Sequence, residues 1–581
     1  MGRGIELVEV VAAKAGNGDQ AGSKTAPHTS IQCLGDDHNG INSPHATSFP
    51  NANGPDLEDC HEKKQGGKVG WKPGVPECLF MTCICILVMM DAFNAMVVIP
   101  LVPDLANSLG QPLENALWIN TSYFLANAAS QTISSMLAEV FGHGPVLLSA
   151  VVLATIGTGV CGGSLNLAGL IAGRSLQGTG GGGILAASFL IISNLIPKYH
   201  QLEFSNYVFR AQVTGSILGA ILGGLFGDYA TTIWLFYSSF VFCALGMLVV
   251  PFAVDLRGCG QGKTGYICKL RRTDWLGTLL ILLGVGCLLI GISWGGTRFS
   301  WDAAATLVPI CVGISLLLVL VVYERFWTVH PFFSSAMFKS LSTTMIHISG
   351  FIHGIIISSH LHFLPLYLTF VKYLPHALTG LGLVAIVALA LPFLILLQKL
   401  RFLSHQPNLN PWILRLGWTL ATISTGCLII LDFHTPTPAW IILFLICGLS
   451  HALLTPSFIR CMFTRPFDPD SDSDSDSDTD PVPKGYSKRK IPPVLLHSIL
   501  RTWGMCIAIP ISGTIMLNQL FWDVERRFPF PGEISYLVEF GALMPGGERD
   551  DYVDGFRVLW PVCTGVAALG AVLGGVWGRV R

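Results

Sequence analysis

Fourteen apolar segments, each about as long as a helix that crosses a lipid bilayer, dominate this 581-residue chain and most constrain its fold. A helix needs about 20 apolar residues to cross the hydrocarbon core, where only helices or closed barrels satisfy their backbone groups. Charged residues make up 12% of the chain, about half the usual share in a soluble domain. We therefore predict an all-α polytopic membrane protein. The segments lie near residues 78–101, 115–138, 145–163, 165–192, 205–226, 232–253, 275–295, 304–323, 346–370, 378–397, 412–432, 437–456, 496–518 and 556–578.

The distribution of basic residues predicts the orientation of these segments. Loops that follow even-numbered segments carry most of the lysines and arginines, at 257–272, 325–339, 399–401 and 484–490. Loops that follow odd-numbered segments carry few, apart from a longer loop of mixed charge near 521–554. Under the positive-inside rule, both termini are then cytoplasmic. We expect a multi-pass protein of the plasma membrane, with the vacuolar membrane as the alternative.

Two polar stretches flank or interrupt the apolar segments. Residues 1–75 lack apolar periodicity and are predicted to form a disordered cytoplasmic tail. The cytoplasmic loop 466–492 contains an alternating Ser/Asp run, and its residues Ser471 to Thr479 suit a kinase that prefers acidic surroundings. The other interpretation of this run is a solvated spacer. With a net charge of −1, the chain gives no indication of nucleic-acid binding.

Asp91 is a carboxylate within the first apolar segment. At membrane depth such a group either pairs with a cation or takes up a proton. Asn94 lies about one turn further on, so the two side chains share a helix face. We expect Asp91 to act in proton coupling or to bind a cationic substrate, with Asn94 on the substrate pathway. The alternative is a hydrated carboxylate or a helix contact.

Arg174 and the glycines from Gly178 to Gly183 interrupt the fourth apolar segment. A guanidinium at membrane depth costs roughly 2.5 kcal/mol on insertion scales, so it is usually kept for function. Gln177 lies three residues on and shares its face. The functional interpretation of Arg174 is a cation that senses or displaces a proton on a nearby carboxylate, and the structural one is a tie to backbone carbonyls.

Nothing in the sequence indicates transport driven by nucleotide hydrolysis, and the glycine run from Gly178 to Gly183 is not a phosphate-binding loop. It lacks the G-K-[ST] ending of a phosphate-binding loop, and no soluble stretch of the chain is long enough to hold a nucleotide-binding domain. Energy must then come from an ion gradient, a partner or the substrate's own gradient. No cofactor is expected, and no H-E-x-x-H or similar spacing indicates a metal site.

The fifth segment repeats glycine every four residues, at Gly215, Gly219, Gly223 and Gly227. Such a smooth stripe allows close helix packing. Packing alone explains it, and a moving seam between two halves requires the same smoothness.

The ninth segment contains four histidines, of which His353 and His360 lie two turns apart. Because histidine titrates near neutral pH, the pair could face one cavity and form a proton relay. The alternative is hydrogen-bonded core histidines.

These features resemble the fungal fourteen-span drug:proton antiporters of the major facilitator superfamily, from about residue 78 to the C-terminus. Arg174 to Gly180 reads R-x-x-Q-G-x-G, as in the family's fourth helix, and Trp118 to Leu125 is similar to its second-helix W-x-x-x-S-Y-x-L. Asp91 stands at the aspartate of the first-helix L-D-x-T pattern, although Met90 and Phe93 replace the leucine and threonine. His353 and Tyr367 fall in segments similar to the family's H-G and L-P-L-Y.

Other elements depart from the family pattern. In the loop after the second helix, Glu139 replaces the usual aspartate and Gly142 is kept, but both basic residues are lost. The antiporter motif G-P-x-x-G-G reads Gly219-Ala220 to Gly223-Gly224, without its proline. The resemblance implies conformational switching at six positions and a substrate pathway at three. The switching set is Glu139, Gly142, Gly215, Gly219, Gly223 and Gly224, and the pathway set is Asn94, Gln177 and Tyr367.

The resemblance implies two six-helix bundles, 76–254 and 331–581, separated by a cytoplasmic loop and two linker helices in 255–330, fourteen spans in all. The implied function is not enzymatic. It is export of an amphipathic organic compound (drug, toxin or secondary metabolite) by proton antiport and alternating access, with Asp91, Arg174 and His353 in proton coupling. Two alternatives stay open. One is proton-coupled uptake of a small solute or siderophore, and the other is a non-transporting sensor with degenerate motor motifs.

Overall fold

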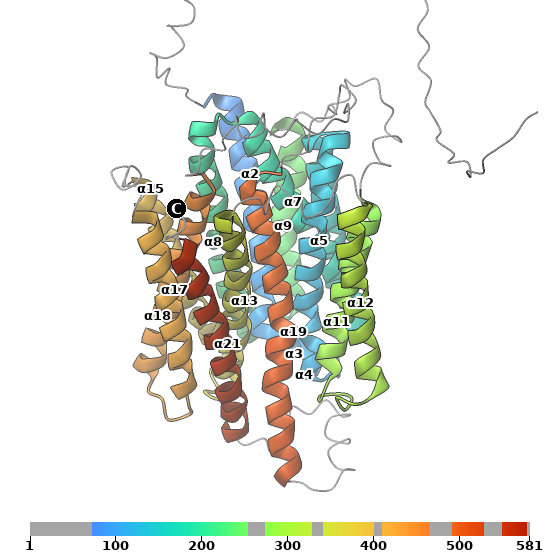
Figure 1. The fold of residues 1–581 in the computed structure, drawn as a ribbon, viewed down its shortest axis with the longest axis vertical. Helices are drawn as coiled ribbons and strands as arrows, with labels where there is room; N and C mark the ends of the chain where they lie inside the picture. The colour runs from blue at the N-terminus through green and yellow to red at the C-terminus, as the bar shows by residue number, and fades with distance from the viewer. Residues whose placement is uncertain are drawn as a thin grey trace, which may run out of the picture. The chain divides into compact units, whose positions relative to one another are not determined.

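Helices account for all the regular structure in the residues that the computed structural model describes, which are 73–253, 274–327, 341–399, 409–463, 491–527 and 549–577. Figure 1 shows most of them as long, roughly parallel rods. The predicted tail 1–75 and acidic loop 466–492 fall almost wholly outside the described residues, and so does the candidate kinase target from Ser471 to Thr479.

The helices of the first bundle are α2 (Val75–Val97), η1 (Ile99–Leu101), α3 (Val102–Ser108), α4 (Leu113–Ala116), α5 (Trp118–Phe141), α6 (His143–Gly163), α7 (Leu167–Leu195), α8 (Lys198–Tyr229) and α9 (Ile233–Ala253). The two linker helices are α11 (Trp275–Trp294) and α12 (Ala304–Phe326). The second bundle comprises α13 (Leu341–Phe370), α14 (His376–Val387), α15 (Ala390–Lys399), α17 (Leu409–Cys427), η3 (Leu428–Ile430), α18 (Thr437–Phe463), α19 (Pro493–Arg527) and α21 (Arg549–Trp577).

Each predicted apolar segment falls on one of these helices or on two consecutive ones, which confirms the all-α polytopic class. Thirteen helices of the described residues are long and apolar enough to cross a membrane. Of the fourteen predicted segments, the one on α5 misses this standard, because the buried face of α5 carries polar residues. Among them are Asn120, Asn127 and Gln131.

Prolines explain two interruptions of otherwise continuous helices. Pro100 and Pro103 lie where α2 gives way to η1 and α3. Pro392 lies four residues after Ala388, the residue that follows α14. Since proline has no N–H, it cannot donate to the carbonyl four residues back. The chain therefore turns at Ala388 and resumes as α15.

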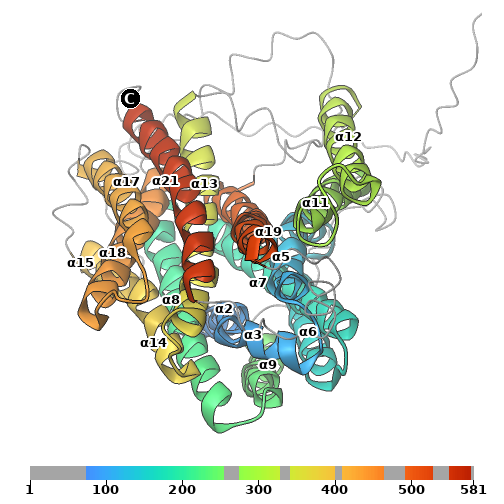
Figure 2. The ribbon, with the colours of Figure 1, turned by 90° about the horizontal axis from the view of Figure 1, so that it is seen from below.

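In the described residues, most helix contacts lie within one or the other of the two expected bundles. In the first bundle α7 packs against α5 and α6, and α2 against α8 and α9. In the second, α13 packs against α19, and α17 against α18 and α21. The linker helices pack against each other, and α11 also touches α5 and α19. Figure 2 shows α11 and α12 at one side of the helices. The bundles meet where α8 packs on α14 and α5 on α19.

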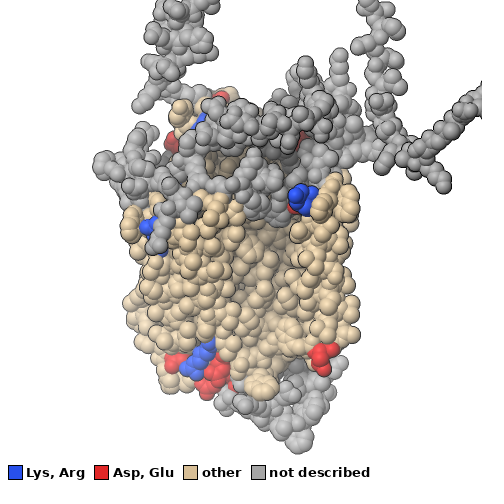
Figure 3. Space-filling model, viewed as in Figure 1, with Lys and Arg blue, Asp and Glu red and all other residues tan. Residues whose placement is uncertain are grey.

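The surface matches a protein embedded in lipid. On the face drawn in Figure 3, the visible charged side chains gather near the two ends of the helices, and the belt between them is uncharged. Large apolar side chains such as Leu318 and Val321 on α12 are exposed. An exposed apolar belt of this extent is expected where hydrocarbon, rather than water, surrounds the helices.

Candidate transport site

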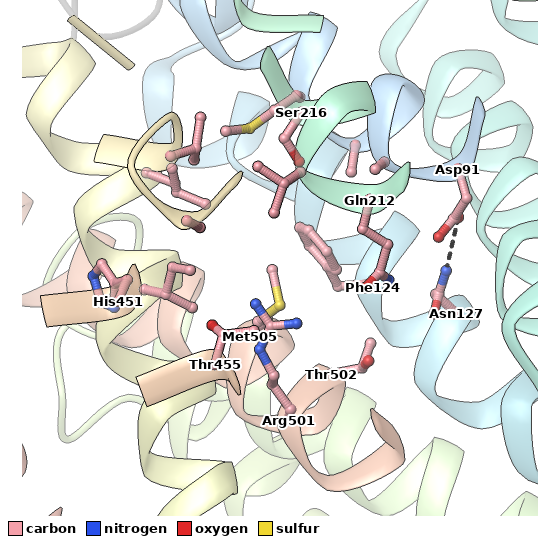
Figure 4. A pocket seen from close by; sticks show the side chains of 18 of the residues that line it. Asp91, Phe124, Asn127, Gln212, Ser216, His451, Thr455, Arg501, Thr502 and Met505 are labelled. Atoms are coloured by element: carbon pink, nitrogen blue, oxygen red, sulfur yellow. Dashed lines mark hydrogen bonds between the residues drawn. The ribbon is translucent and has the colours of Figure 1, made fainter. Parts of the chain in front are cut away.

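A pocket lies between the two bundles and is bordered by helices of both (Figure 4). Its walls come from α2, α5, α7 and α8 on one side and from α13, α14, α15, α18 and α19 on the other. Most lining side chains are apolar, and a few polar ones converge among them. The ionisable and amide side chains in the lining are Asp91, Tyr123, Asn127, Gln212, His362, His451 and Arg501. A mostly apolar cavity with a few placed polar groups is typical of a small-molecule site.

Asp91 projects from α2 and is 5% exposed. The hydroxyl of Tyr123 donates to its Oδ1 over 2.5 Å, and the Asn127 amide donates to the same oxygen over 3.2 Å. Both donors come from α5. They keep the carboxylate hydrogen-bonded in a buried position, where an unpaired polar group would be costly.

Arg174 is fully buried on α7 and bonds to amides and carbonyls. It donates to the carbonyl oxygen of Asn94 at 2.9 Å, to Gln177 Oε1 at 2.7 Å and to Asn120 Oδ1 at 2.9 Å. Its guanidinium carbon also lies 4.3 Å from the centroid of the Tyr123 ring. Among the described residues no carboxylate forms an ion pair with Arg174, so Tyr123 is the group that touches both Arg174 and Asp91.

The other first-bundle residues expected on the substrate pathway surround Arg174 rather than the pocket. Gln177 accepts from Arg174 and donates to Thr158 Oγ1 over 3.0 Å. Asn94 accepts from Ser239 on α9 through its side-chain oxygen. Neither belongs to the pocket lining, and their transport roles stay predictions.

The glycine run of α7 brings this helix against α5 and α2. A Cβ added at Gly178 would overlap the carbonyl oxygen of Tyr123, and one at Gly182 would overlap that of Asn127. A Cβ at Gly181 would overlap the carboxylate of Asp91. The run therefore lets the backbone approach the residues that hold Asp91.

The glycine stripe of α8 serves two different contacts. Gly215, Gly219 and Gly223 face backbone of α2, within the first bundle. Gly224 instead faces the backbone of His376 in α14, and a Cβ on Gly380 would overlap the carbonyl oxygen of Ala220 in α8. Close packing inside a bundle and close packing between bundles thus use adjacent faces of one helix.

The loop after α5 keeps its glycine for a conformational reason. Gly142 has φ +91°, which side-chain-bearing residues rarely adopt, and it joins α5 to α6. Glu139 is exposed one turn before it. Next in the chain, His143 Nε2 lies 2.7 Å from Asn194 Nδ2 at the end of α7. The switching roles expected for Gly142 and Glu139 stay predictions.

Histidines of the second bundle form a hydrogen-bonded row. His353 Nε2 lies 3.2 Å from His451 Nδ1, and His451 Nε2 lies 3.0 Å from His360 Nδ1. His360 Nε2 in turn lies 3.1 Å from the hydroxyl of Thr425. All three rings are buried. His353 and His360 therefore meet through His451, which lines the pocket.

Tyr367, expected on the substrate pathway, lies near the end of α13 instead of in the pocket lining. Its hydroxyl donates to the carbonyl oxygen of Asp432 over 2.8 Å. In this position it ties α13 to the turn that follows α17 and η3, and a pathway role stays a prediction.

Sequence reasoning gave no role to several residues that make up the site. On α5, Tyr123, Asn127 and Gln131 recur every four residues and so share one face. Gln131 Nε2 donates to Asn127 Oδ1 over 2.9 Å and to Thr502 Oγ1 of α19 over 3.0 Å. The four-residue spacing of polar side chains inside an apolar segment was the signal for the α5 residues. Nothing local indicated that Thr502 would meet them.

Comparison with known proteins agrees with this architecture. Residues 84–467 match the Major Facilitator Superfamily. The chain is 26% identical over 514 residues to "MFS transporter L2" of a Phoma species, which covers 86% of this chain and 82% of that protein. It is 27% identical over 373 residues to "MFS-type efflux pump LUC4" of a Fusarium species, covering 64% of this chain and 65% of that protein.

Among solved structures, a bacterial homologue of the human lysosomal transporter Spinster, inward-facing and unoccupied, is similar with a TM-score of 0.54. The identity is 12%, and the match covers 88% of this chain and 98% of that one. At this identity the likeness concerns the fold alone. The family match extends over more than half of the sequence, and this chain therefore belongs to the major facilitator superfamily of membrane transporters.

Proposed function

We propose that this transporter exports amphipathic organic compounds by exchange with protons. The observation that carries the proposal is the position of Asp91, a buried carboxylate that opens on a mostly apolar pocket between the two bundles. A carboxylate there can hold a proton or release it when a ligand arrives. The outward direction is supported by relatives such as the Fusarium protein, which is named an efflux pump.

Proton coupling in the first bundle centres on Asp91, with Arg174 acting through Tyr123. The phenol hydroxyl donates to the ionised carboxylate, and the phenol ring accepts the guanidinium on its face. Protonation of the carboxylate would weaken its bond with Tyr123 and favour the other acceptor of that hydroxyl, the carbonyl oxygen of Asp91 at 2.9 Å. A shift of the Tyr123 ring would then move the guanidinium of Arg174 relative to the amide and carbonyl oxygens that accept from it.

In the second bundle, the row of His353, His451 and His360 is our candidate for proton transfer. Imidazole can accept a proton at one nitrogen and release it from the other. Because His451 lines the pocket and His353 and His360 lie on either side of it, a proton could pass along the row. This makes His353 a proton-coupling residue that acts away from the pocket.

Transport would follow an alternating-access cycle in which the bundles rock about the pocket. The contact of α8 with α14 at Gly224, and the loop with Glu139 and Gly142, are our candidates for switching between states. We place both termini in the cytoplasm and the protein in the plasma membrane. The Ser/Asp run from Ser471 to Thr479 is our candidate target for a kinase.

Reconstitution with matched variants tests the coupling. Purified protein is placed in liposomes that contain a pH-sensitive dye, and proton movement is recorded while a panel of fluorescent amphipathic compounds is offered. Wild type should move protons against compound. Asp91→Asn should lose proton movement but still bind compound, and Asp302→Asn, which alters an exposed loop carboxylate, should behave as wild type.

The direction is tested in cells that lack the protein. Higher retention of compound in such cells fits export, whereas lower accumulation indicates uptake. Unchanged accumulation at every pH indicates a sensor. Full proton coupling in Asp91→Asn would show that the coupling residue is wrongly assigned, whatever the direction.

A further inference from the structure

Arg501 is a second cation at the site, and the proton-coupling scheme does not use it. It projects from α19 into the pocket between the bundles (Figure 4). It is half-buried, and its Nε is buried without a hydrogen-bond partner. Arg174, by contrast, has each of its three nitrogens hydrogen-bonded. Arg174 therefore has its hydrogen-bonding capacity used within the protein, whereas Arg501 faces the cavity with a donor still available.

No carboxylate in the described parts of the chain pairs with Arg501. Asp91 is the one carboxylate among the lining residues of the described structure. Figure 4 shows it on another side of the pocket, bonded to Asn127. The titratable neighbours of Arg501 are His353, His451 and His497, which lie on α13, α18 and α19. Imidazole cannot neutralise a guanidinium, so the cation is uncompensated.

The pocket into which Arg501 projects offers hydroxyl groups as well as apolar surface. Ser498, Thr502 and Thr455 line the pocket from α19 and α18, and Figure 4 shows Thr455 and Thr502 near Arg501. Apolar side chains from α13, α14 and α8, among them Leu361 and Val387, complete the cavity. A molecule that fits such a lining has an apolar body and one polar end.

We propose that the substrate is an amphipathic organic anion whose carboxylate or similar acidic group binds Arg501. This rests on the proposed transport function and names its substrate class. An uncompensated guanidinium at membrane depth is costly, and a bound carboxylate would remove that cost by accepting two parallel N–H bonds. The hydroxyls of Thr455 and Ser498 would donate to the acidic group, and the apolar body would lie against Leu361 and Val387.

A set of matched ligands tests the proposal on the full-length protein in detergent. The probes are aromatic and aliphatic carboxylic acids, each paired with its primary amide, with dansyl-leucine and dansyl-leucinamide as one pair. The acid of the fitting pairs should bind wild type about 10- to 100-fold more tightly than its amide, the range of a charge-assisted hydrogen bond. Arg501→Gln should abolish that preference and leave amide binding unchanged.

Two further variants guard the interpretation. Arg415→Gln makes the same change on α17, outside the pocket lining, and should keep the preference. Arg501→Lys retains the charge but not the planar fork, so it should weaken acid binding several-fold without affecting the amide. If Arg501→Gln does not fold, the affinities of wild type and Arg501→Lys for the acid and its amide test the proposal instead.

Three outcomes would overturn the proposal. They are a panel in which no acid is preferred over its amide, a preference that survives Arg501→Gln, and equal acid binding by wild type and Arg501→Lys. Proton coupling is read separately through Asp91→Asn. Proton-coupled movement of neutral or cationic compounds without acid preference would defeat this inference alone. Acid preference without proton movement would defeat only the antiport.

Discussion

The guanidinium of Arg174 lies over the ring of Tyr123, with 4.3 Å between its central carbon and the ring centroid. The hydroxyl of that ring donates to Asp91. One aromatic side chain thus connects the buried cation to the buried carboxylate, and the two charges do not touch each other. This arrangement makes Tyr123 the place where coupling between them can be tested with the least disturbance.

Tyr123→Phe removes the hydroxyl but keeps the ring beneath Arg174. We expect proton-driven efflux to fall about tenfold and the free energy of unfolding to fall by about 1 kcal/mol, the usual worth of one hydrogen bond. The initial efflux rate in liposomes and thermal unfolding in detergent measure the two effects. Tyr207→Phe, at an exposed position with a long hydrogen bond to Glu203, is the control. An unchanged efflux rate in Tyr123→Phe would remove this residue from coupling.

Gly182→Ala tests the close approach of α7 to α5. Its Cβ would overlap the carbonyl oxygen of Asn127, so we expect a loss of about 1–3 kcal/mol in the free energy of unfolding from overpacking. Gly565→Ala, in the interior of α21, meets nothing within 4 Å of the new Cβ. It should be neutral or stabilising by up to about 1 kcal/mol. Thermal unfolding of both variants gives the answer, and equal midpoints would contradict the packing argument.

The hydrogen bond from Gln131 to Thr502 joins the bundles beside the pocket. A double-mutant cycle with Gln131→Ala and Thr502→Val should give a coupling free energy of about 0.5–1.5 kcal/mol. The measurement is the free energy of unfolding of wild type, both single variants and the double variant. Strictly additive effects would mean that this contact adds nothing to the closure of the bundles in the state described.

Glu114, in α4 between two membrane-spanning segments, provides a pH test. Burial raises its pKa above the usual 4.5, and the backbone and the charge of Arg298 offset this in part. The folded state then keeps a proton that the unfolded state has already lost, so stability falls as the pH rises from about 4.5 through the folded pKa.

Glu114→Gln should abolish that fall in stability and be at least as stable as wild type at pH 7. Thermal unfolding between pH 4 and pH 7 measures the difference. If wild type instead became more stable than Glu114→Gln as the pH rises through this range, the pKa of Glu114 would be lowered by folding, contrary to the prediction.

Much of the fold was predictable, because hydropathy acts segment by segment. A stretch of about 20 apolar residues must be helical in a membrane wherever it lies in the chain. Even α5 was recognised, although its polar face lowers its apolar character. Family membership was predictable for a similar reason, since Arg174 to Gly180 is a contiguous motif.

The site was predictable only in part. Asp91 and Arg174 stood out because ionisable residues are rare in apolar segments. Their partners Tyr123 and Asn127 were harder to predict, because a tyrosine or an asparagine is common in membrane helices for reasons of packing alone. Arg501 also lies in a predicted apolar segment, but its open position in the pocket depends on how α19 packs against the other helices.

The sequence alone determined the helices, their order and the family, because backbone desolvation and short motifs act over a few turns of chain. Only the tertiary structure decided which polar groups meet. Gln131 and Thr502 are 371 residues apart, and His451 lies 98 residues from His353 and 91 from His360. Such contacts depend on the rotation and depth at which whole helices pack. The same packing leaves Arg174 enclosed by acceptors and Arg501 facing the pocket.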